Sequence, residues 1–140
     1  MISELAASDR TGAKLRKLAM ELLSSLPGYD WCGVYRLEGD ALILDEYAGA
    51  STQHDRIPVG TGVCGTAVAE NRNQIIDDVQ SLENYLPCSL ETRSEIVVLI
   101  RDGDAILGQI DIDSHSPSAF GPDDERLLEG VAAILAKAWS

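Results

Sequence analysis

Residues 94–114, SEIVVLIRDGDAILGQIDIDS, constrain the fold more than any other part of this chain. Two apolar, strand-like runs flank Asp102-Gly103-Asp104, a turn signal typical of a β-hairpin. An earlier pair of runs, WCGVYRL and ALILDEYAG, is separated by Glu38-Gly39-Asp40 and predicts a second hairpin. Two hairpins indicate a sheet that is largely antiparallel.

Helices are predicted at both ends of the chain. Apolar residues recur at i, i+3, i+4 and i+7 from Leu15 to Leu26, as in an amphipathic helix that ends before Pro27-Gly28. A closing helix, Pro122 to Ala138, opens with a proline and acidic residues. Shorter elements follow from residues 65–71, as a helix, and from IIDDV at 75–79, as a strand.

This order predicts a single α+β domain over residues 1–140. The two terminal amphipathic helices offer a seam for a homodimer, although packing on the chain's own core explains their apolar stripes equally well.

Charge and cysteine content narrow the classes of partner. A net charge of −12 argues against nucleic acid and anionic membranes, because phosphate binding needs Lys and Arg patches. No apolar run approaches the roughly 20 residues of a membrane span, and the N-terminus lacks the pattern of a secretory signal. Three cysteines without framework spacing fit a reducing compartment. We therefore expect a cytoplasmic protein.

Three acidic residues and two cysteines are the candidates for chemistry. Asp111 and Asp113 alternate within IDID, so both carboxylates project from one face of a strand, where they are costly unless something needs them. Glu95 opens the neighbouring apolar run. Cys64 lies in the glycine-rich RIPVGTGVCGTA, and Cys88 follows a proline in LPCSLETRSEIVV. Thiols within reach of such acids suggest redox chemistry on a small polar substrate.

These segments also carry a family resemblance. RIPVGTGVCGTAVAE, the stretch from Cys88 to Glu95 with SEIVV, and GQIDIDSHSPSAFGPDDERLL resemble the free methionine-(R)-sulfoxide reductases, a small group of GAF-fold enzymes. The likeness extends from about Trp31 to the final helix. It implies a central, mostly antiparallel sheet with the N- and C-terminal helices packed together on one face. It also implies an enzyme of oxidative-stress defence that reduces free methionine-(R)-sulfoxide without a cofactor or metal.

The resemblance assigns roles to particular residues. Cys88 would be the nucleophile, which becomes a sulfenic acid, and Cys64 would resolve it by forming a disulfide that a thioredoxin-type reductant opens. Glu95, Asp111 and Asp113 would bind the substrate ammonium and protonate the sulfoxide oxygen. Trp31 and Tyr35, which share a strand face, would hold the thioether end and the ammonium.

One position departs from the family pattern. Members commonly carry a third active-site cysteine two residues before the Arg of RIPVG, where this chain has His54. Either Cys64 resolves alone, or an external thiol does so, or the reductase activity has been lost. In the last case the chain would be a ligand-binding GAF module. A thiol redox sensor is a further alternative. Cys32 does not replace the missing thiol, because it alternates with Trp31 and points to the opposite strand face; we interpret it as a buried apolar residue.

Overall fold

A six-stranded sheet forms the centre of the molecule in the computed structural model, which describes residues 1–82 and 91–140. The strand order is β3-β2-β1-β6-β5-β4, and every pairing between neighbouring strands is antiparallel. The strands are β1 (Trp31–Glu38), β2 (Ala41–Ala48), β3 (Arg56–Pro58), β4 (Gln74–Ile76), β5 (Ser94–Asp102) and β6 (Ala105–Ser114). Both predicted hairpins, β1–β2 and β5–β6, are confirmed.

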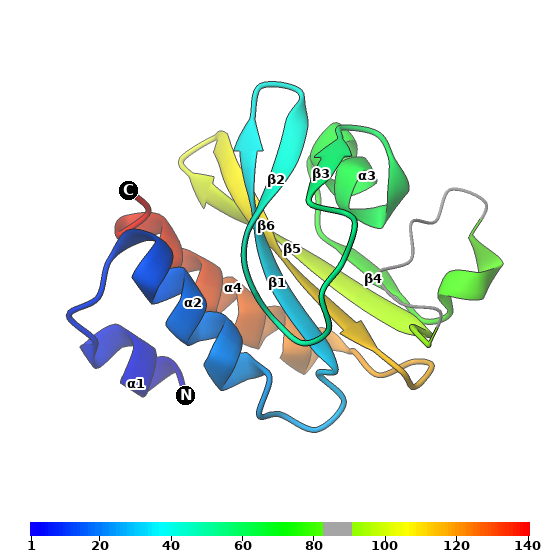
Figure 1. Ribbon diagram of the computed structural model, residues 1–140, viewed down its shortest axis with the longest axis horizontal. Coiled ribbons are helices and arrows are strands. Elements are labelled where there is room, and N and C mark those ends of the chain that lie inside the picture. The colour runs from blue at the N-terminus through cyan, green and yellow to red at the C-terminus, as the bar shows by residue number, and fades with distance from the viewer. Residues whose placement is uncertain (83–90) are drawn as a thin grey trace.

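Helices of the two chain ends cover one face of this sheet (Figure 1). Helices α2 (Gly12–Leu23) and α4 (Pro122–Lys137) contact the strands, and α1 (Ile2–Ala7) packs against these two helices. Helix α3 (Gly62–Glu70) lies on the opposite side and contacts β5, β3, β2 and β6. The arrangement confirms the α+β architecture with terminal helices on one face. None of the helices in residues 1–82 and 91–140 is long and apolar enough to span a bilayer.

Strand alternation divides the apolar side chains into two cores. The core beneath the terminal helices contains Val34 of β1, Val98 of β5 and Ile110 of β6 together with the apolar stripes of α2 and α4. Those stripes are therefore buried within the chain, as core packing predicts. The second core, on the α3 side, contains Trp31 and Tyr35 with residues of β2, β3, β5 and α3.

Local chemistry explains where element boundaries differ from the sequence prediction. Helix α2 ends at Leu23, three residues early, because the hydroxyls of Ser24 and Ser25 donate to carbonyls of the preceding turn. The prediction of a strand at residues 75–79 is wrong in its second half, because strand β4 ends at Ile76. Asp78 accepts a hydrogen bond from the Gln80 backbone N–H at 3.1 Å and caps a 3-10 turn, η1 (Val79–Ser81).

Helix α4 begins as the sequence predicts. Pro122 is its first residue, and the Asp124 carboxylate accepts a hydrogen bond from the Gly121 backbone N–H at 2.9 Å. The other oxygen of Asp124 accepts from the Tyr29 hydroxyl at 2.6 Å. This contact ties the start of α4 to the segment leading into β1.

Candidate active site

Three neighbouring strands bring the predicted acids together on the α3 side of the sheet. In the β5–β6 register Glu95 lies opposite Asp113, and in the β1–β6 register Trp31 lies opposite Asp113 from the other side. Asp111, two residues along β6, lies between Val97 and Gly33. The prediction that Asp111 and Asp113 share one face with Glu95 therefore agrees with the geometry.

These carboxyl groups are removed from water. The exposed fractions are 4% for Glu95, 0% for Asp111 and 1% for Asp113. Burial, reinforced by the charges of Asp111 and Asp113, raises the pKa of Glu95 well above its ordinary value. Burial also raises the pKa of Asp111, an effect that the approach of Glu95 and the Cys64 thiol partly opposes. Of Glu95 and Asp111, Glu95 is consequently the carboxyl group better suited to hold a proton near neutral pH.

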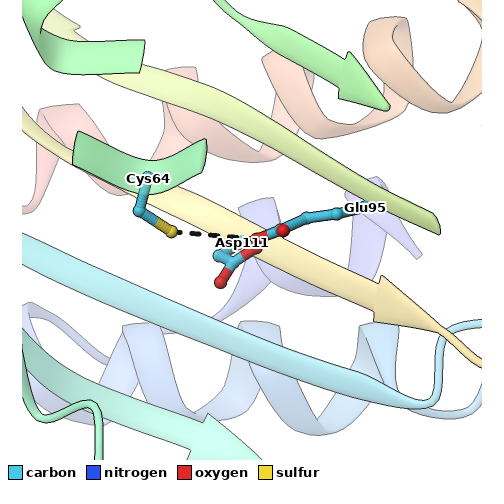
Figure 2. Close-up of side chains that lie close together, drawn as sticks. All are labelled: Cys64, Glu95 and Asp111. Atoms are coloured by element: carbon cyan, nitrogen blue, oxygen red, sulfur yellow. Dashed lines mark hydrogen bonds between the residues drawn. The ribbon is translucent and has the colours of Figure 1, made fainter. Parts of the chain in front are cut away.

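A tight loop delivers the Cys64 thiol to this cluster. Cys64 lies in the first turn of α3, after Gly60 and Gly62, whose φ angles of +93° and +65° favour glycine. Gly65 packs so closely that a Cβ there would lie 2.5 Å from the Pro58 carbonyl oxygen. The Cys64 Sγ then lies 3.9 Å from Glu95 Oε2 and points toward the carboxylates (Figure 2).

Gln109 is a site residue that the sequence interpretation did not include. Its side chain is completely buried, and its Nε2 donates a hydrogen bond to the backbone carbonyl of Cys64 at 2.9 Å. It lies on the same face of β6 as Asp111, two residues before it, so the alternation in QIDID could have identified it. Gln109 thereby attaches the first turn of α3 to the sheet.

A narrow cavity opens beside the thiol and two of the acids, and the part of it that the described residues line has a volume of about 10 Å³. Its described lining consists of His54, Ile57, Thr61, Gly62, Val63, Cys64, Glu95 and Asp111. Within the described part of the chain, neither carboxylate oxygen of Asp111 makes a hydrogen bond of good geometry. A buried carboxylate without such a partner favours a cationic or hydrogen-donating ligand.

Trp31 and Tyr35 hold the loop that follows β2. The Trp31 indole donates to the Ala50 carbonyl and the Tyr35 hydroxyl donates to the His54 carbonyl, each at 2.9 Å. The Trp31 ring also stacks on Tyr47. Neither aromatic residue is among the described lining of the cavity, so their contact with a substrate stays a prediction. Through His54, Tyr35 fixes one wall of that cavity.

The structure describes only one of the two remaining cysteines, Cys32. Cys88, the predicted nucleophile, lies outside the described residues. Cys32 is completely buried on the helix side of the sheet, opposite to Cys64, as the alternation predicts. Burial raises the pKa of the Cys32 thiol to about 12, with the nearby carboxylates adding to the effect. Cys32 is therefore unsuited to thiolate chemistry.

Comparison with known proteins defines the class. The GAF domain family matches residues 14–139, and the chain belongs to it. A free methionine-R-sulfoxide reductase of Escherichia coli is 39% identical over 125 residues, which cover 89% of this chain and 75% of the relative. The chain accordingly belongs, within the GAF domains, to the free methionine-R-sulfoxide reductase family of oxidoreductases.

Solved structures agree with this assignment. A type II free methionine-R-sulfoxide reductase from Thermoplasma acidophilum is 36% identical, with a TM-score of 0.87, and the match covers 99% of this chain and 94% of that one. A free methionine-R-sulfoxide reductase from Neisseria meningitidis, solved in complex with its substrate, is 31% identical with a TM-score of 0.91. That match covers 99% of this chain and 83% of the other.

Proposed function

We propose that this protein reduces free L-methionine-(R)-sulfoxide to methionine, using Cys88 as nucleophile and the acidic cavity as the substrate site. The observation that carries the proposal is the meeting of three buried carboxyl groups and the Cys64 thiol on one sheet face. The name of the E. coli relative, a free methionine-R-sulfoxide reductase, supports the same substrate.

The reaction transfers the sulfoxide oxygen to the enzyme. The Cys88 thiolate attacks the electrophilic sulfur, and the sulfoxide oxygen takes up a proton. Oxygen transfer to Cys88 then leaves a sulfenic acid on the enzyme and releases methionine, so the cysteine is oxidised by two electrons as the sulfoxide is reduced. Protonation matters because an unprotonated oxygen remains strongly bonded to sulfur.

Glu95 is the proposed proton donor. Its pKa is raised by burial and by the two neighbouring aspartates, so it carries a proton at a pH where an exposed glutamate has lost it. Asp111 and Asp113 then remain to neutralise the α-ammonium of the free amino acid. This division gives the three carboxyl groups separate roles.

Cys64 is the proposed resolving thiol. It attacks the Cys88 sulfenic acid, which forms a Cys64–Cys88 disulfide and releases water. Two thiols of a thioredoxin-type protein then reduce that disulfide. Disulfide formation needs Cα atoms within about 7 Å of each other. A cytoplasmic location and a homodimer also remain proposals.

A coupled assay tests the function. Consumption of NADPH by thioredoxin reductase and thioredoxin is followed after addition of free methionine-(R)-sulfoxide. Sustained consumption that Cys88→Ser abolishes is expected. Absence of turnover would contradict the proposal; if hydrogen peroxide still formed a Cys64–Cys88 disulfide in that inactive protein, the redox-sensor alternative would be favoured.

A further inference from the structure

The group formed by Cys64, Glu95 and Asp111 has the composition and spacing of a metal site. One ligand atom from each residue lies within 4.8 Å of the other two, and all three residues are buried. Figure 2 shows the sulfur and the carboxylate oxygens directed toward one another from α3, β5 and β6. These elements are distant in sequence, so no ligand spacing along the chain could have indicated the group.

The distance between the Cys64 and Glu95 ligand atoms requires little adjustment to accept zinc. A tetrahedral ion with Zn–S of about 2.3 Å and Zn–O of about 2.0–2.2 Å separates its sulfur and oxygen ligands by about 3.5 Å. The Cys64 Sγ lies 3.9 Å from Glu95 Oε2. A movement of a few tenths of an ångström, within rotamer freedom, closes that difference. Water can occupy the fourth position, as in zinc sites with three protein ligands.

Asp111 supplies an independent indication that a cation belongs here. It is completely buried, lines the cavity, and has two oxygens without a well-formed hydrogen bond among the described residues. A divalent cation satisfies those oxygens and takes the place of the proton that Glu95 otherwise holds, which is released when the metal binds. A thiolate ligand and low coordination number favour zinc over Mg²⁺ or Ca²⁺, which require more oxygen ligands.

We propose that Cys64, Glu95 and Asp111 bind Zn²⁺, and that the bound ion inhibits the enzyme by occupying the substrate cavity. The competition with substrate rests on the proposed function, whereas the metal site does not. Bound zinc would hold Cys64 as a metal thiolate, which removes it from disulfide formation, and would occupy the carboxylates proposed to receive the ammonium. Free zinc would therefore act as a reversible inhibitor.

The metal site is tested with Co²⁺, a spectroscopic substitute for Zn²⁺, on the reduced protein. Wild type should show a thiolate-to-cobalt charge-transfer band that stoichiometric Zn²⁺ abolishes. Cys64→Ser should lack the band, while Cys32→Ala and Cys88→Ser should keep it. Because changes beyond the first coordination shell already cost about 10–100-fold in affinity, Cys64→Ser and Asp111→Asn should each weaken Zn²⁺ binding more than about a hundredfold.

Surface binding is the competing explanation, since the chain contains 23 Asp and Glu residues. Zinc affinity unchanged in both Cys64→Ser and Asp111→Asn, or a charge-transfer band that depends on Cys88 and not on Cys64, would overturn the site. Circular dichroism of each variant establishes that the fold is retained.

Displacement of the metal by substrate tests the competition between zinc and substrate separately from the existence of the metal site. In Cys88→Ser protein, which is not expected to consume substrate, free methionine-(R)-sulfoxide should reduce the cobalt band in proportion to its occupancy. A band that persists at saturating sulfoxide would refute the competition and the placement of substrate in this cavity. The ligand variants would still decide the metal site by themselves.

Discussion

Glu95→Gln is the substitution that most directly separates chemistry from structure at this site. The amide keeps the size of the carboxyl group and can still accept from the Cys64 thiol, 3.9 Å away in the native protein. It cannot deliver a proton to the sulfoxide oxygen. Since general acid catalysis contributes about 10²–10⁴-fold, we expect at least about a hundredfold loss in turnover, or about 2.7 kcal/mol of transition-state stabilisation.

The pH dependence of turnover distinguishes the loss of a general acid from other causes of reduced activity. Glu95 must be protonated to act as an acid, and burial with the neighbouring aspartates raises its pKa. Wild-type turnover should consequently fall as the pH rises through that raised pKa. The Glu95→Gln variant has no proton to lose at this position, so the corresponding decline should disappear from its residual activity.

Stability should change in the opposite direction from activity. The folded protein holds a proton on Glu95 that the unfolded chain releases above a pKa of about 4.5. The stability linked to this proton is complete below the unfolded pKa and is lost as pH rises through the folded one. Glutamine does not titrate, so the Glu95→Gln variant does not lose stability in this way as the pH rises. Urea unfolding at pH 8 should therefore show the variant to be at least as stable as wild type.

Rapid-quench measurement of methionine formed in one turnover is the assay, because it is independent of the reductant. Glu129→Gln, which neutralises an exposed glutamate of α4 outside the cavity lining, is the matched control and should retain wild-type rates. A Glu95→Gln variant within about threefold of wild type, with the same pH profile, would refute the role of Glu95 as acid, because the loss expected from general acid catalysis is at least about a hundredfold.

Three further predictions follow from the same geometry. Cys64→Ser should form one methionine per chain and then stop under thioredoxin, so wild-type steady-state turnover in this variant would exclude Cys64 as the resolving thiol. N-acetyl methionine-(R)-sulfoxide lacks the ammonium, so its kcat/KM should be at least about a hundredfold lower than that of free methionine-(R)-sulfoxide, because leaving a buried charge pair broken costs roughly 3–5 kcal/mol. Comparable values for the two substrates would show that the acids do not recognise the ammonium. Gln109→Leu removes the hydrogen bond to the Cys64 carbonyl and should lower the free energy of unfolding by about 1–3 kcal/mol in urea titration, whereas an unchanged midpoint would contradict this.

Regular alternation made the strands and the shared face of the acids predictable. Because side chains alternate along a strand, IDID specified that Asp111 and Asp113 point together, and WCGVY specified that Cys32 points away from them. The hairpin turns at Gly39 and Gly103, both with positive φ, were equally predictable from the sequence. Short elements were not. Strand β3 has three residues and is defined by its pairing with β2, which a local pattern cannot express.

Contacts across the fold were beyond the sequence pattern. The hydrogen bond from Gln109 to the Cys64 carbonyl joins residues 45 positions apart, and the approach of Cys64 to Glu95 joins residues 31 positions apart. The placement of Tyr35 beneath the His54 loop likewise depends on how that loop returns to the sheet. Such distances arise only when β1, β5, β6 and α3 are assembled.

Peptide mapping after a single turnover tests the central claim most directly. Fully reduced protein is mixed with excess free methionine-(R)-sulfoxide without any reductant, and methionine and disulfides are quantified together. We predict one methionine per chain and one disulfide, between Cys64 and Cys88, with Cys32 still reduced. Failure to form methionine, or methionine formed while Cys88 remains a free thiol, would contradict the account.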